Sequence, residues 1–152
     1  MQIETRINGR VVTFDFPVGE FLVETLRRYG YLSVKQGCDT GSCGLCTVWL
    51  DGRPVLSCCT LTARTGGREI TTIEGVQEEA EQFARCLVGQ GAEQCGFCAP
   101  GLTMTVLALK RELIHPTEEA INHYLAGNLC RCSGYQGQLR AIKHFLGVSE
   151  CA

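Results

Sequence analysis

The chain has 152 residues, of which 45% are hydrophobic and 20% are charged, and its formal net charge is -2 at pH 7. This length and composition fit one ordinary domain or two small ones in a packed globular protein, and they exclude a disordered or fibrous chain. The charge excludes a protein that binds nucleic acid through a strongly basic surface, and no apolar run approaches the roughly 20 residues needed to cross a bilayer.

The first part of the chain predicts strands around one helix. Residues 2–7 alternate between polar and apolar, Asn8-Gly9 favours a tight turn, and residues 11–16 follow as a second strand. After Pro17, apolar residues recur at helical spacing until Gly30, which suits the end of a helix. Further strands are predicted at residues 47–50, 55–58 and 69–73. This order of elements predicts an α+β domain.

From residue 77 onward the spacing of apolar residues becomes helical. One helix has its apolar stripe at Ala80, Phe83, Ala84, Leu87 and Val88. A second helix follows Pro100, Thr117 is suited to cap a third, and a fourth begins near Tyr135. These four helices predict a small all-α bundle, and the change of pattern predicts two domains, residues 1–75 and 76–152.

The chain contains 11 cysteines, an odd and large number for its length. The sequence begins without the pattern of a secretory signal, so we expect a cytoplasmic setting in which thiols stay reduced and bind metal. Four of the cysteines have the spacing of a plant-type ferredoxin and predict a [2Fe–2S] cluster. They are Cys38, Cys43, Cys46 and Cys58.

A second group of four consists of two short pairs, Cys95 with Cys98 and Cys130 with Cys132. The pairs fall before the second predicted helix and between the third and fourth, so they can converge at one end of the bundle. Taken alone, this spacing also fits a structural zinc site with four thiolates. Of the remaining cysteines, Cys59 and Cys86 are predicted to pack, Cys59 on the other face of a strand and Cys86 on a helix, and Cys151 is predicted to be free.

Three motifs, which together extend over nearly the whole chain, connect the cysteines to a known family. They are Gly37-Cys-Asp-Thr-Gly-Ser-Cys-Gly-Leu-Cys-Thr47, Gln94-Cys-Gly-Phe-Cys-Ala-Pro-Gly101 and Gly127-Asn-Leu-Cys-Arg-Cys-Ser-Gly-Tyr135. In this order they closely resemble the small iron–sulfur subunit of the molybdenum hydroxylases, the family of xanthine dehydrogenase and aldehyde oxidoreductase. Ala99 and Ser133 stand where that family often has threonine, and neither change removes a proposed ligand.

The resemblance implies a β-grasp ferredoxin fold for the first domain and two [2Fe–2S] clusters in the chain. It places the C-terminal cluster nearest a molybdenum–pterin cofactor on a separate large subunit and the N-terminal cluster nearer FAD on another subunit, in a hetero-oligomer. By the same resemblance, Gln94 and Cys132 match positions close to the pterin.

No nucleotide-binding glycine loop, acid–base pair or activated nucleophile is present in the sequence, so we expect an electron carrier with no catalytic residue of its own. The expected route runs from molybdenum through the C-terminal cluster and the N-terminal cluster to FAD. Xanthine or another purine is the first substrate expected for the assembled enzyme. Other possible substrates are aldehydes, N-heterocycles and carbon monoxide, and electrons would flow in the reverse direction in a hydroxybenzoyl-CoA reductase. Two other classes of protein also remain open: a freestanding ferredoxin and a zinc-stabilised assembly module.

Overall fold

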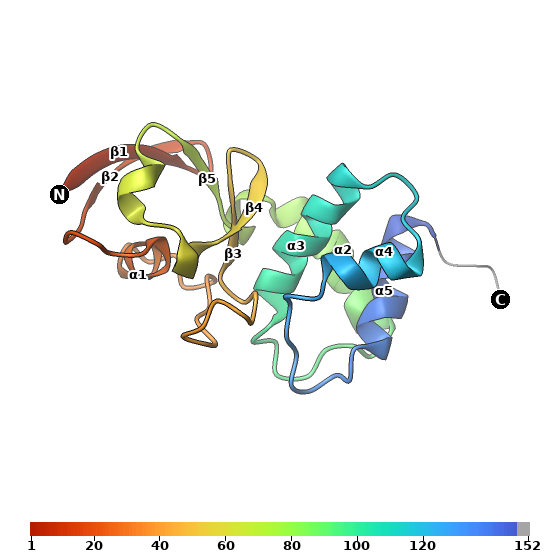
Figure 1. Cartoon of the computed structure of the whole chain (residues 1–152). Coiled ribbons are helices and arrows are strands. Elements are labelled where there is room, and N and C mark those ends of the chain that lie inside the picture. Colours follow the sequence, from red (N-terminus) through yellow and green to blue (C-terminus); the bar gives the residue numbers. More distant parts are fainter. Residues whose placement is uncertain (149–152) are drawn as a thin grey trace.

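A mixed five-stranded sheet forms one end of the molecule and a group of helices forms the other (Figure 1). The computed structural model describes residues 1–148. The order of strands in the sheet is β2-β1-β5-β3-β4. The strands are β1 (Gln2–Ile7), β2 (Arg10–Asp15), β3 (Thr47–Leu50), β4 (Arg53–Leu56) and β5 (Glu69–Thr71).

Two tight turns set the register of the sheet. Asn8 and Gly9 join β1 to β2 with φ values of 52° and 77°, and Asp51 and Gly52 join β3 to β4 with 51° and 78°. Positive φ at both central residues is the geometry of a hairpin turn whose twist matches the strands. β5 pairs parallel to β1 and antiparallel to β3, so it joins the two hairpins into one sheet.

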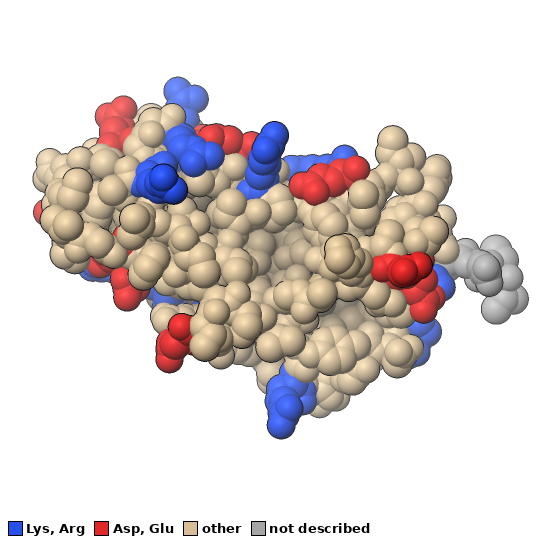
Figure 2. All heavy atoms as spheres, in the orientation of Figure 1, with Lys and Arg blue, Asp and Glu red and all other residues tan. Residues whose placement is uncertain are grey.

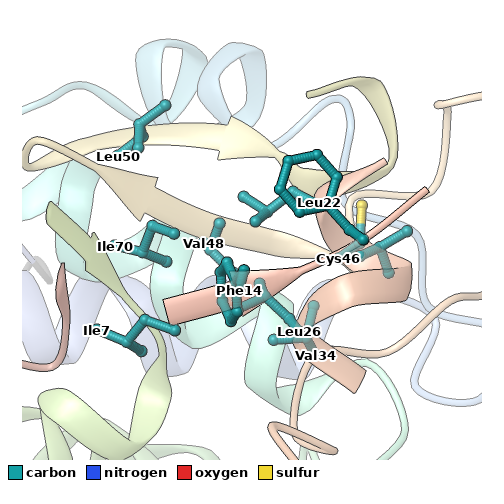
Figure 3. Packing of buried hydrophobic residues seen from close by; sticks show 11 residues of the cluster. Ile7, Phe14, Leu22, Leu26, Val34, Cys46, Val48, Leu50 and Ile70 are labelled. Atoms are coloured by element: carbon teal, nitrogen blue, oxygen red, sulfur yellow. The ribbon is translucent and has the colours of Figure 1, made fainter. Parts of the chain in front are cut away.

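Strand β3 lies in the middle of the molecule and is buried on both faces. Val48 and Leu50 belong to the same core cluster as Phe14 and Leu22 of α1 (Leu22–Arg28), and Figure 3 shows Val48 beside Phe14. Trp49 points to the opposite side, as alternation in a strand requires, and packs against a helix of the second half.

Four helices follow the sheet, in agreement with the expected bundle. They are α2 (Gln77–Gly89), α3 (Ala99–Glu112), α4 (Glu118–Tyr124) and α5 (Gln136–Leu146). Their shared core includes Phe83, Val106, Ile121 and Ile142, each at most 1% exposed. None of the helices within residues 1–148 has the length and apolar character of a membrane span.

Helix α4 begins at the threonine expected to cap it. The backbone N–H of Ala120 donates to the Thr117 hydroxyl oxygen at 3.2 Å. Replacing Thr117 with alanine is expected to lower the free energy of unfolding by about 1 kcal/mol, because one N–H of the first turn loses its acceptor. Urea unfolding of Thr117→Ala beside Thr117→Ser, which keeps the hydroxyl, measures the difference; equal stability of the two variants would contradict it.

Two expectations about single residues were wrong. The strand expected at residues 55–58 ends at Leu56, and the chain turns into a 3-10 helix, η1 (Ser57–Cys59), which leaves Cys59 exposed and not packed on a strand face. Val88 is 68% exposed, because α2 turns only Ala80, Phe83 and Leu87 fully inward. Cys151 lies outside the described residues.

Candidate metal centres

The first cysteine group is formed by the loop before β3 and the turn after β4. Cys38, Cys43 and Cys46 lie on residues 35–46, which have no regular secondary structure, and Cys58 lies in η1. Cys43 and Cys46 are 5% and 2% exposed, whereas Cys38 and Cys58 are half-buried. The group therefore has an inner side against the protein and an outer side close to the surface.

Pairing of β3 with β4 brings Cys46 and Cys58 together. Thr47 lies opposite Leu56 in the antiparallel ladder, and the two cysteines stand just beyond this last pair. The backbone N–H and the hydroxyl of Ser57 both donate to the carbonyl oxygen of Cys46, at 3.3 and 2.8 Å. Burial and the neighbouring Cys46 thiol raise the pKa of Cys58.

Donors converge on the sulfur of Cys38. The Cys43 thiol and the backbone N–H groups of Thr40, Cys43 and Ser42 lower the pKa of Cys38 to about 6. Burial, in contrast, raises the pKa of Cys43. Hydrogen-bond donors directed at sulfur stabilise the thiolate form of cysteine. An iron–sulfur cluster needs such donors, because it is bound by thiolates and carries a negative charge.

The second group lies at the start of two helices. Cys95 and Cys98 directly precede α3, and Cys130 and Cys132 precede α5. The sulfurs of Cys95 and Cys132 are 3.5 Å apart, and both residues are exposed. Cys98 and Cys130 are in contact on the inner side, where burial and the Cys130 thiol raise the pKa of Cys98 to about 11.

Two polar side chains whose contacts the sequence did not predict, Ser133 and Gln138, are directed at these sulfurs. The backbone N–H and the hydroxyl of Ser133 donate to the sulfur of Cys130 at 3.4 and 3.2 Å. Burial raises the pKa of Cys130, but these Ser133 donors and the Cys132 N–H outweigh it and lower the value to about 7. Gln138, only 6% exposed, donates from Nε2 to the sulfur of Cys98 at 3.8 Å. Neither residue has a spacing that marks it as a sulfur donor.

In both groups the thiols are arranged as pairs. The contacts join Cys38 to Cys43, Cys46 to Cys58, Cys95 to Cys132 and Cys98 to Cys130. Within residues 1–148, no three His, Cys, Asp or Glu side chains are gathered closely enough to hold a single metal ion. A zinc ion needs four thiolates at about 2.3 Å from one point, whereas each iron of a two-iron cluster takes its own pair of protein thiolates. The donor set therefore fits two [2Fe–2S] clusters better than zinc.

Gln94 lies against the outer pair of the second group. Its side-chain Nε2 donates to the carbonyl oxygen of Cys132 at 3.1 Å. The two residues that the motif resemblance singled out are thus in contact, on an exposed edge of the molecule.

The two cysteine groups are neighbours. The loop before β3 and the loops before α3 and α5 lie along the same edge, at the bottom of Figure 1. The backbone N–H of Leu129 donates to the carbonyl oxygen of Cys43 at 2.9 Å. A groove of about 390 Å³ beside this contact is lined by residues of both groups, including Cys43 and Cys130.

Cys59 and Cys86 lie outside both groups. The sulfur of Cys59 is 3.7 Å from that of Cys58. Cys86 is half-buried on α2, as expected of a packing residue, and its sulfur is 3.5 Å from Nδ1 of His144. Cys86 on α2 and His144 on α5 are 58 residues apart in sequence, so no local spacing could predict this contact.

Charged side chains are interspersed on the face shown in Figure 2, and an uncharged area occupies its centre. Acidic and basic residues both lie around this area, on the sheet side and on the helix side. This distribution agrees with the net charge of -2 and offers no basic stripe for a nucleic acid on that face.

Two family models match the chain. Residues 5–65 match the "2Fe-2S iron-sulfur cluster binding domain" and residues 72–143 match the "[2Fe-2S] binding domain". Each matched segment contains one of the two cysteine groups.

Whole-chain relatives agree with the family models. The chain is 38% identical to the nicotinate dehydrogenase small FeS subunit of Eubacterium barkeri, over 99% of this chain and 96% of that protein. It is 45% identical to the xanthine dehydrogenase iron-sulfur-binding subunit of Escherichia coli O157:H7, over 88% of this chain and 87% of that one.

Solved structures share the fold. A chain of quinoline 2-oxidoreductase from Pseudomonas putida 86 superposes with a TM-score of 0.86 at 35% identity, covering 93% of this chain and 90% of that chain. Aldehyde oxidoreductase from Desulfovibrio gigas gives a TM-score of 0.85 at 35% identity over 97% of this chain, which corresponds to 17% of that longer chain.

Proposed function

The chain belongs to the iron–sulfur subunits of the molybdenum hydroxylases, and from this membership we propose that it relays single electrons between a molybdenum–pterin site and FAD on partner subunits. It is the [2Fe–2S] electron-transfer component of an oxidoreductase complex, as its family models and relatives indicate. The observation that carries the proposal is the presence of two adjacent cysteine groups, each composed of two thiol pairs.

We assign Cys38, Cys43, Cys46 and Cys58 as ligands of the N-terminal cluster, and Cys95, Cys98, Cys130 and Cys132 as ligands of the C-terminal one. When bound, each cluster supplies a centre that accepts and releases one electron. The backbone N–H groups around Cys38 and the Ser133 donors to Cys130 stabilise thiolate there, and hydrogen bonds to sulfur of this kind help set the reduction potential. The division into domains at residue 75 is part of the same proposal.

The proposed route enters at the C-terminal group and leaves at the N-terminal group. Support comes from the exposure of Cys95 and Cys132 and from the apolar residues around them. Phe97, Leu129 and Tyr135 are 46%, 47% and 45% exposed, and all three line the groove beside the second group. Apolar and aromatic side chains of this kind suit a permanent subunit contact, which we assign to the large molybdenum-binding subunit.

Gln94 is proposed to couple the pterin to the C-terminal cluster. Replacing Gln94 with alanine should leave the iron content unchanged, because Gln94 donates to a carbonyl oxygen and not to a sulfur. Electron delivery from the molybdenum subunit is expected to slow by about tenfold, as for other residues that orient ligands without binding the metal. Stopped-flow reduction of the assembled complex measures this rate, with Gln82→Ala on the exposed face of α2 as the control. An unchanged rate of reduction in Gln94→Ala would contradict the proposed coupling role of Gln94.

The substrate of the assembled enzyme is proposed to be xanthine or another purine. The relative at 45% identity is a xanthine dehydrogenase subunit, which favours this choice. A pyridine carboxylate is the second candidate, since the relative at 38% identity is a nicotinate dehydrogenase subunit.

The test is to assemble the chain with its molybdenum-binding subunit, without the FAD-binding subunit, and to add xanthine or nicotinate under anaerobic conditions. We expect one of the two substrates to reduce the iron–sulfur centres by two electrons per chain, one for each cluster. A chain that does not bind the large subunit, or that is fully active alone, would favour a freestanding ferredoxin.

A further inference from the structure

Helix α3 approaches the first cysteine loop with no side chain between them. Gly101, in the first turn of α3, is buried. A Cβ at this position would lie 2.6 Å from the carbonyl oxygen of Gly44 and 2.8 Å from Cα of Leu45. Both neighbours are backbone atoms between the ligands Cys43 and Cys46, so they cannot move aside as a flexible side chain would.

The segment before Cys130 meets the same loop. A Cβ on Gly44 would lie 2.3 Å from the carbonyl oxygen of Gly127, and the backbone N–H of Leu129 donates to the carbonyl oxygen of Cys43 at 2.9 Å. The first cysteine loop is thus in direct backbone contact with both segments that carry the second group.

The side chain of Asn128 joins these three segments. Its Nδ2 donates to the Thr105 hydroxyl of α3 at 3.1 Å and, at 3.5 Å, to the carbonyl oxygen of Gly44. The Thr105 hydroxyl in turn donates to the carbonyl oxygen of Gly101 at 3.0 Å. One amide group therefore connects the first loop, the helix after Cys98 and the segment before Cys130.

Helix stability does not explain the glycine. Glycine inside a helix is less favourable than alanine by up to about 1 kcal/mol. Gly101 can approach Gly44 and Leu45 this closely only because it has no side chain. An added methyl group would push α3 away from the loop.

We propose that Gly101 and Asn128 are positioning residues that set the distance between the two clusters and thereby the rate at which they exchange an electron. This rests on the proposed function. Neither residue binds iron: Gly101 has no side chain, and the amide nitrogen of Asn128 is directed at oxygen atoms.

The experiment uses the whole cluster-loaded chain reduced with dithionite. Low-temperature electron paramagnetic resonance detects the magnetic interaction between two reduced clusters, which weakens steeply as their separation grows, and iron analysis confirms that both clusters are present. Gly101→Ala is expected to keep its iron but to show a smaller splitting than the wild type. Gly89→Ala is the matched control, because it makes the same change in a helix where a Cβ would have nothing within 4 Å.

Asn128→Asp is the second variant, since it preserves the size of the side chain and removes the amide donor. If Gly101→Ala does not bind its clusters, the splitting measured in Asn128→Asp tests the inference instead, and we expect it to be smaller than in the wild type. The inference is overturned if Gly101→Ala binds both clusters and shows the wild-type splitting. If Gly101→Ala does not bind its clusters, the wild-type splitting in Asn128→Asp overturns it instead. A wild-type chain that holds both clusters but shows no magnetic interaction between them also overturns it. A wild-type chain without iron would instead overturn the proposed function.

Discussion

Replacing Cys130 with alanine is expected to reduce bound iron from about four atoms per chain to about two, because one two-iron cluster is lost and the other remains. Cys130 is half-buried, in contact with Cys98, and its sulfur accepts hydrogen bonds from the backbone and the hydroxyl of Ser133. The ligands assigned to the first cluster lie on other segments, so that cluster should keep its signal.

The same substitution should destabilise the helical half. A unit of about 75 residues buries a marginal core and commonly needs a metal or disulfides in addition. Thermal unfolding of the anaerobically purified variant should therefore begin with the helices at a lower temperature than in the wild type. Cys86→Ala is the matched control, since Cys86 is also half-buried but lies outside both groups. An iron content that stays near four, or a melting profile identical to that of the wild type, would refute this assignment.

Replacing Trp49 with alanine is expected to lower the free energy of unfolding by about 3–5 kcal/mol, the usual cost of removing a buried tryptophan. Trp49 is 2% exposed and packs between β3 and α3. Its Nε1–H donates to the carbonyl oxygen of Met104 at 2.9 Å, and the guanidinium of Arg111 lies 4.0 Å from the centre of its ring. The alanine variant would leave a cavity where the sheet meets the helices.

Trp49→Phe separates packing from hydrogen bonding. It keeps most of the apolar volume and loses the Nε1–H donor, so we expect a loss of about 1 kcal/mol. Urea unfolding of the three loaded proteins measures both values. If Trp49→Ala unfolds at the wild-type urea concentration, the contact between the sheet and α3 does not stabilise the molecule.

The sequence predicts an element well where the element depends on a few consecutive residues. Positive φ at Asn8-Gly9 and a threonine hydroxyl at the start of α4 are properties of a few consecutive residues, and both were found as expected. The spacing of cysteines is also local. It identified the two groups, whereas the closeness of Cys95 to Cys132 depends on how α3 and α5 pack.

Features created by tertiary packing were not predictable. Trp49 lies in the strand predicted at residues 47–50, but the carbonyl that accepts its Nε1–H is 55 residues away along the chain, so no local pattern indicates it. Cys59 does not lie on the face of a strand, because β4 ends at Leu56 and Ser57 turns toward the carbonyl oxygen of Cys46. The close approach of Gly101 to Gly44 likewise leaves no periodic pattern, since a glycine in a helix has no side chain to place on a face.

The most direct test of this account is the magnetic resonance spectrum of the anaerobically isolated chain before and after dithionite. We expect about four irons per chain, no signal in the oxidised protein, and two paramagnetic centres that together take up two electrons on reduction. A colourless chain that contains zinc, or one that gives no paramagnetic signal after reduction, would contradict the assignment of both cysteine groups.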